Sequence, residues 1–95
     1  MVDFVKLGDF LYKRRSNLGY TQEIVVSIIG ISNRTLRNIE YGKTAPDFET
    51  IMMLWDLYSL SPDELFIFYS RDEVMTEMEL ICRNIKRKKV SVGKQ

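Results

Sequence analysis

Residues 21–43 read TQEIVVSIIGISNRTLRNIEYGK, a pattern that predicts two short helices joined by a tight turn. Thr21 can cap the first helix, because its hydroxyl can accept a hydrogen bond from a backbone N–H of the first turn. Gly30 is expected to end this helix, since glycine readily adopts the left-handed conformation that reverses a chain. Ser32 can then cap the second helix, which is predicted over residues 33–40.

Each predicted helix has an apolar side that can pack on a core. In the first helix this side is expected to contain four residues: Ile24, Val25, Ile28 and Ile29. In the second helix we expect Leu36 and Ile39 to be buried, which leaves four hydrogen-bonding side chains exposed: Asn33, Arg34, Arg37 and Asn38. Amide and guanidinium groups can pair bidentately with adenine and guanine edges in the major groove of DNA, which is wide enough to admit a helix.

The stretch resembles the helix-turn-helix motif of the Cro/C1-type (XRE) family of phage and bacterial DNA-binding regulators. The similarity extends to Leu7-Gly8 and Gly19-Tyr20 before the motif and to Glu40-Tyr41-Gly42-Lys43 at its end. It implies a compact five-helix fold of the lambda-repressor type that binds double-stranded DNA without a cofactor. Val26 and Trp55 depart from the family, which commonly has small residues at these places, and we expect local repacking there.

The helix over residues 33–40 is the predicted recognition helix. Five of its residues are candidates for reading base edges: Asn33, Arg34, Thr35, Arg37 and Asn38. Arg37 could instead turn toward the DNA backbone or pair with an acidic residue. Thr35 could either offer its methyl group to a thymine or simply cover the turn.

Three other residues are candidates for contacts with DNA phosphates: Gln22, Lys43 and Thr44. Gln22 begins the first helix of the motif, where a side-chain amide and free backbone N–H groups can together hold a phosphate. Lys43 and Thr44 follow the recognition helix, where they could bind the backbone together with the N–H of Gly42. The alternative for these two residues is a plain helix cap.

The resemblance also implies an ion pair between Arg15 and Glu40, which would link the first helix to the end of the recognition helix. If the pair is partly buried, its role is to hold the recognition helix at a fixed angle. The alternative is two unrelated surface charges, whose pairing would contribute at most about 1 kcal/mol.

The rest of the sequence predicts further helices and no strands, so the expected fold class is all-α. A helical pattern covers residues 4–17, and Asp47 can cap a fourth helix. Residues 61–64, Ser-Pro-Asp-Glu, form a capping box that opens a short fifth helix. These elements make a predicted DNA-binding domain over residues 1–69.

A C-terminal helix is predicted over residues 70–89, because a second capping box opens it. This helix carries an apolar stripe: Val74, Met78, Ile81 and Ile85. Either the stripe packs back on the core, or it meets the same stripe of a second subunit. We favour the homodimer, because small domains of this type commonly bind DNA as dimers. Residues 90–95 are expected to be a disordered tail.

Composition restricts the possible functions. The 95 residues are 45% apolar and make one small domain. Histidine is absent and Cys82 is the single cysteine, so the sequence offers neither the commonest general base nor a cysteine-built metal site. We therefore expect no enzyme activity and no metal. No apolar stretch is long enough to span a bilayer, which predicts a cytoplasmic protein without membrane contact.

Charge is segregated along the sequence. Residues 1–45 contain seven basic and four acidic residues, and residues 46–79 contain one basic and nine acidic residues. Residues 80–95 contain six basic residues and no acidic ones. The positive motif half can attract phosphate, while the acidic half is either simply solvated or meets a protein partner.

These observations predict a sequence-specific DNA-binding transcriptional regulator, with repression as the expected role. It would bind a palindromic operator as a homodimer, through the helix over residues 33–40. The alternative is a protein-interaction module, such as an antitoxin or a partner-binding domain, that uses the acidic C-terminal half. The chain could also be the N-terminal piece of a longer regulator.

Overall fold

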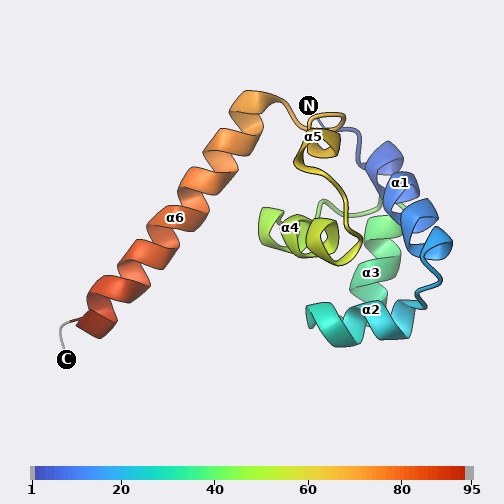
Figure 1. Ribbon diagram of the computed structural model, residues 1–95, viewed down its shortest axis with the longest axis horizontal. Helices are drawn as coiled ribbons and strands as arrows, with labels where there is room; N and C mark the ends of the chain where they lie inside the picture. Colours follow the sequence, from blue (N-terminus) through green and yellow to red (C-terminus); the bar gives the residue numbers. More distant parts are fainter. Residues whose placement is uncertain (1, 94–95) are drawn as a thin grey trace.

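The computed structural model describes residues 2–93, and it describes side chains as far as Ile85. Within these residues every regular element is a helix, which confirms the predicted all-α fold. The elements are α1 (Phe4–Asn17), α2 (Gln22–Ile29), α3 (Asn33–Glu40), α4 (Phe48–Leu57), α5 (Pro62–Leu65) and α6 (Arg71–Gly93). Figure 1 shows α1 to α5 gathered into one body, from which α6 extends.

The helices begin where the sequence places capping side chains. The hydroxyl of Thr21 accepts from the N–H of Ile24 at 3.2 Å, and Asp47 Oδ1 accepts from the N–H of Thr50 at 2.9 Å. These bonds satisfy N–H groups that have no partner inside the helix. Because the signals are local, the starts of α2 and α4 agree with the sequence-based prediction.

The last two helices open with the predicted capping boxes. The N–H of Ser70 donates to Glu73 Oε1 at 2.9 Å, and the N–H of Glu73 donates back to Ser70 Oγ at 3.1 Å. The bond from the Ser70 backbone holds the pKa of Glu73 below its usual value. At the other end, α6 continues to Gly93, beyond the expected end at residue 89. Residues 94–95 of the expected tail lie outside the described residues.

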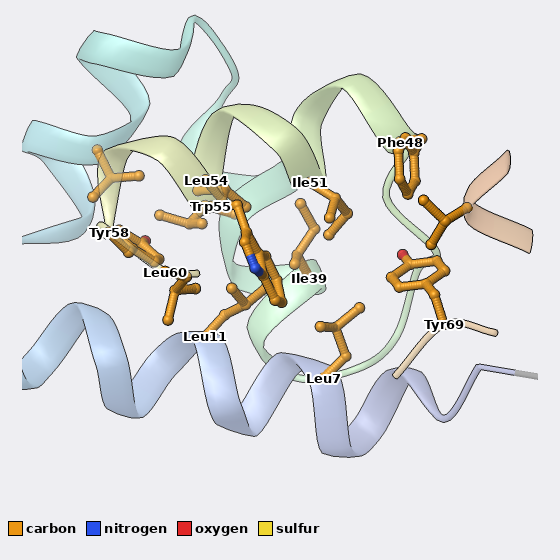
Figure 2. Close-up of a cluster of buried hydrophobic side chains, with 13 residues drawn as sticks. Leu7, Leu11, Ile39, Phe48, Ile51, Leu54, Trp55, Tyr58, Leu60 and Tyr69 are labelled. Carbon is orange, nitrogen blue, oxygen red and sulfur yellow. The ribbon is translucent and has the colours of Figure 1, made fainter. Parts of the chain in front are cut away.

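The core lies between α1 and α4, with α3 closing one side (Figure 2). Its members are buried apolar side chains from all of the elements except α5: Leu7, Leu11, Val25, Leu36, Ile39, Phe48, Ile51, Leu54, Trp55, Tyr58, Leu60, Tyr69 and Val74. Trp55, a departure from the family pattern, is buried and its indole N–H donates to the carbonyl of Ser61 at 3.0 Å. That bond satisfies the one polar atom of the indole ring.

The apolar side of α2 differs from the prediction. Val25 is fully buried and Ile29 packs on the core, but Ile24 and Ile28 are 45% and 60% exposed. Successive helical residues are turned by about 100°, so Val25 and Ile29 lie about 40° apart and define the buried side, whereas Ile24 and Ile28 lie about 80–120° from its centre. The expectation that Ile24 and Ile28 face the core was therefore wrong.

α1 and α3 approach each other unusually closely at Gly8. A Cβ atom at this position would collide with the carbonyl oxygens of Ile39 and Glu40. Gly8 therefore allows the C-terminal end of α3 to lie directly on α1, which fixes one end of the predicted recognition helix.

The helix α6 has little contact with the body after its first turns. Figure 1 shows α5 at the start of α6 and the far end of α6 well away from α4. Val74 is buried, Ile81 is partly buried against the core, and Met78 and Ile85 are 41% and 52% exposed. The predicted stripe is thus divided, with two members on the body of the same chain and two open to solvent.

Candidate nucleic-acid interface

The turn between α2 and α3 sets the angle of the candidate interface. Gly30 has a φ of 85°, in the left-handed region, so the chain reverses directly after α2. Ile31 packs in the corner against the core, and Ser32 then starts α3 by accepting from the N–H of Thr35 at 3.0 Å. The two helices of the motif are held together by a glycine turn, an apolar corner and a cap.

The outer side of α3 carries unpartnered hydrogen-bonding side chains. Leu36 and Ile39 are buried beneath it, while Asn33, Arg34 and Arg37 are exposed and Asn38 is half-buried. Among the described residues, none offers these four side chains a hydrogen bond or an ion pair. Arg37 therefore does not form the intramolecular pair that the sequence left open for it.

Thr35 is placed differently from the other candidates of α3. Its hydroxyl lies 2.8 Å from the hydroxyl of Ser32, at the start of the helix. The hydroxyl is thus engaged in the cap. This contact engages the hydroxyl only, so the methyl group of Thr35 remains a candidate for contact with a thymine.

Arg15 and Glu40 form a bidentate ion pair between α1 and the end of α3. Arg15 Nε lies 2.6 Å from Glu40 Oε2, and Arg15 Nη2 lies 3.1 Å from Glu40 Oε1. Both residues are buried, and Arg15 Nη1 also donates to the carbonyl of Tyr20 at 2.8 Å. The hydrogen bond to Glu40 raises the pKa of Arg15 further above its usual value. The pair is not the loose surface contact of the alternative interpretation.

Gln22 also contacts this ion pair, a bond that was not predicted from the sequence. Its Nε2 donates to Glu40 Oε1 at 3.0 Å, so one carboxylate holds residues from α1, α2 and α3. A carboxamide nitrogen has two hydrogens, and the second remains available for a phosphate. An amide and a carboxylate can form this bond, but Gln22 and Glu40 are 18 positions apart, and no local pattern in the sequence indicates that they meet.

Lys43 and Thr44 lie in the exposed loop after α3. The N–H of Lys43 donates to the carbonyl of Asn38 at 2.9 Å, which satisfies one of the last carbonyls of the helix. The Lys43 ammonium lies 5.7 Å from the centre of the Tyr41 ring, within the range of a cation–π contact. The backbone of Lys43 thus acts in the helix end, while its charge stays at the surface.

The charge of this face is positive. Residues 21–44 contain three exposed basic residues, Arg34, Arg37 and Lys43, and one exposed acidic residue, Glu23. The remaining acid, Glu40, is matched by Arg15. A surface of this sign attracts a phosphate backbone.

The described part of the chain offers neither a metal site nor a membrane span. Among residues 2–85, whose side chains the structure describes, no cluster of three or more acidic, histidine or cysteine side chains could hold a metal ion. Within residues 2–93, none of the helices combines the length and apolarity needed to cross a bilayer.

Comparisons with known proteins point to the same motif. A family model described as a helix-turn-helix domain matches residues 8–69. The chain is 35% identical over 75 residues to the HTH-type transcriptional regulator ImmR of Bacillus subtilis (strain 168), in an alignment that covers 79% of this chain and 57% of ImmR. It is 28% identical over 78 residues to the SPbeta prophage-derived uncharacterized HTH-type transcriptional regulator YonR of the same organism, over 78% of this chain and 72% of YonR. The chain thus matches little more than half the length of ImmR.

Proposed function

We propose that this chain, which belongs to the Cro/C1-type (XRE) helix-turn-helix family of transcriptional regulators, represses transcription by placing α3 in the major groove of an operator. DNA binding and a regulatory role follow from the family. Repression, the operator and the residues that read it are the proposal. A regulator of this kind would act in the cytoplasm, where bacterial DNA lies.

The observation that carries the proposal is the unpartnered polar surface of α3. Arg34 can donate bidentately to a guanine, and Asn38 can both donate to and accept from an adenine. Exposed residues with flexible side chains are ordinary on a helix surface. The combination is more specific here, because the same helix is fixed by a glycine contact at Gly8 and by the buried pair of Arg15 and Glu40.

Phosphate contacts at both ends of the motif would position α3. At the start of α2, the free N–H groups of the first turn and the second amide hydrogen of Gln22 can hold one phosphate. After α3, Lys43 and Thr44 can hold another. Contacts of this kind fix the register of the protein on the duplex without reading sequence.

A homodimer would present two such helices to successive major grooves, about 34–36 Å apart, and so bind a palindromic operator. The proposed dimer contact is the exposed part of the α6 stripe, Met78 and Ile85. The other two residues of the stripe, Val74 and Ile81, support it from the side of the core.

A second candidate function is protein binding by the acidic half of the chain. It is favoured by exposed apolar residues among the acidic ones, in particular Met52, Phe66 and Met75. An antitoxin or a partner-binding module would use such a surface. In that case the exposed face of α3 would be an ordinary solvated surface.

The dependence of DNA binding on salt tests the two functions against each other. The purified chain should bind duplex DNA at low salt, and its affinity should fall linearly on a logarithmic scale as salt rises, because Lys and Arg contacts release counterions. Several phosphate contacts predict a slope steeper than about −2. Absence of duplex binding at about 50 mM salt would instead support the protein-interaction function.

A further inference from the structure

An open apolar groove runs between α4 and α6. One part, of about 350 Å³, is lined by Met52 and Met53 of α4 and by Ile81 and Ile85 of α6. A second part, of about 380 Å³, lies toward the start of α6 and shares Met52 with the first. Trp55 and Met78 line this second part. We call the two parts together the α4–α6 groove.

The α4–α6 groove leaves large apolar side chains in water. Met52 and Met53 are 41% and 42% exposed, and Met78 and Ile85 are exposed to a similar degree. Covering the groove would remove this apolar surface from water, which is favourable. The groove follows the helix axis of α6, which is the shape that another amphipathic helix fills.

The charge of α6 changes sign along its sequence. Near the start of α6, Asp56 of α4 lines the groove. The first half of α6 carries four acids, of which Glu73 and Glu77 flank the apolar stripe, while Asp72 and Glu79 lie on the far side of the helix. In the second half of α6 the sequence has Arg83 and then Lys-Arg-Lys-Lys at residues 86–89, with no acid. α6 is therefore an amphipathic helix with an acidic first half and a basic second half.

We propose that the α4–α6 groove receives α6 of a second copy of this chain, running antiparallel, with the two-fold axis close to Ile81. A parallel arrangement would put acid beside acid and base beside base, which is unfavourable. In the antiparallel arrangement the basic second half of each α6 lies beside the acidic first half of its partner and beside Asp56. Ile81 lies about midway between the two charged blocks, and this midpoint sets the register.

The proposal accounts for the division of the apolar stripe. Val74 packs on the body of its own chain, and this contact sets the direction in which α6 leaves the domain. Met78 and Ile85 are then free for the partner helix, and Met52 and Met53 extend the interface onto α4. The inference rests on the homodimer of the proposed function, but it does not depend on DNA binding.

Disulfide trapping tests the direction of the helices. In a Cys82→Ser background, which removes the native thiol, Ile81→Cys should give a disulfide-linked dimer when oxidised with diamide. Ile81 is only partly covered by its own chain and lines the groove, and in the proposed dimer it lies at the axis opposite Ile81 of the second copy. Ile85→Cys should not give such a dimer, because four residues from the axis in each chain separates the two positions by about 12 Å along the helices. A disulfide needs Cα atoms within about 7 Å. Thr76→Cys, exposed on the opposite side of α6, is the matched control.

A parallel pair would instead trap Met78→Cys, Ile81→Cys and Ile85→Cys equally, and that result would overturn the proposal. Circular dichroism of each variant before oxidation would establish that it is folded. Trapping at Thr76→Cys as strong as at Ile81→Cys would mean random collision and would also overturn it.

Sedimentation equilibrium without DNA tests the participation of α4. Met52→Asp should raise the dimer Kd about tenfold or more, since it places a charge in the groove. Ile28→Asp, at an exposed apolar position on α2 outside the groove, should leave the Kd unchanged. A monomeric wild-type chain, or equal effects of both substitutions, would contradict the groove as the interface. A monomer that still binds DNA would leave DNA recognition by α3 intact, so the two proposals fail separately.

Discussion

Arg34 and Asn38 of α3 have no intramolecular partners among the described residues, and we propose that they read bases. We predict that Arg34→Ala and Asn38→Ala each lose about 1–3 kcal/mol of affinity for the operator and little for scrambled DNA, because the lost hydrogen bonds go to particular bases. Binding isotherms on the two duplexes measure this difference. Thr76→Ala on α6 should change neither isotherm. Equal losses on operator and scrambled DNA would remove the two residues from base reading.

Lys43 and Gln22 are expected to behave differently, because phosphates carry no sequence information. Lys43→Ala should weaken binding on every duplex and should reduce the slope of log K against log salt by about one unit. Gln22→Ala should weaken binding on every duplex with an unchanged slope, since the amide is neutral. A slope that Lys43→Ala leaves unchanged would argue against its phosphate contact.

Tyr58 is a buried residue whose hydroxyl has no hydrogen-bond partner among the described residues. Burial raises the pKa of this hydroxyl, and the nearby Glu40 raises it further. We predict that Tyr58→Phe increases the free energy of unfolding at pH 7 by about 1 kcal/mol, because it removes a polar group that is buried without compensation. Chemical denaturation measures the change, and Tyr12→Phe at an exposed position should have no effect. A loss of stability in Tyr58→Phe would mean that the hydroxyl has a partner.

The same tyrosine predicts how stability depends on high pH. An unfolded tyrosine loses its proton near pH 10, whereas burial raises the pKa of Tyr69 to about 12 and also raises that of Tyr58. Between about pH 10 and 12 the unfolded state therefore binds fewer protons than the folded state, and stability falls as pH rises. In Tyr58→Phe this fall should be smaller. An equally steep fall would show that Tyr58 does not contribute to it.

At the scale of the elements, one carboxylate holds three helices together. Glu40 accepts from Arg15 of α1 and from Gln22 of α2, and it belongs to α3 itself. We predict that Glu40→Ala lowers the free energy of unfolding by about 3–5 kcal/mol, because it leaves the buried guanidinium of Arg15 without its charge partner. Denaturant unfolding measures the loss.

The double variant Arg15→Met with Glu40→Met is the informative control, since it removes both charges and fills the space. It should be much closer to the wild type in stability than Glu40→Ala. If the double variant is as unstable as Glu40→Ala, the attraction between Arg15 and Glu40 must exceed the cost of removing both charges from water, and the prediction is wrong.

The elements also show how far sequence reasoning reaches. The starts of α2, α4 and α6 were predictable, because Thr21, Asp47 and Ser70 cap them through bonds to residues three positions away. The turn at Gly30 was also predictable, because glycine readily adopts the left-handed conformation that ends a helix. Interactions between residues close in sequence determine these features, so they can be predicted from a single sequence.

Tertiary contacts limited the rest of the prediction. Ile24 and Ile28 are apolar, and only the positions of α3 and α4 decide that they remain exposed. The bond from Gln22 to Glu40 depends on how α2 meets the end of α3.

At the scale of the whole molecule, the charges of the chain fall on separate surfaces. The motif face is positive, the first half of α6 and the neighbouring α4 are acidic, and the second half of α6 is basic in sequence. In the proposed dimer the acidic and basic parts neutralise each other between subunits, which leaves the positive motif faces for DNA. The net charge of the whole chain is only +1, although the positive charge of the motif face is what would steer the protein to phosphate.

We propose above all that α3 reads bases as part of a two-fold assembly. Selection of binding sites from a random DNA pool with the purified chain tests it most directly. The account predicts enrichment of an inverted repeat whose half-site centres lie about one helical turn, or 10–10.5 base pairs, apart or a multiple of this spacing. A pool that binds the protein but remains random in sequence would contradict the account, because it would mean that the protein holds the phosphate backbone alone.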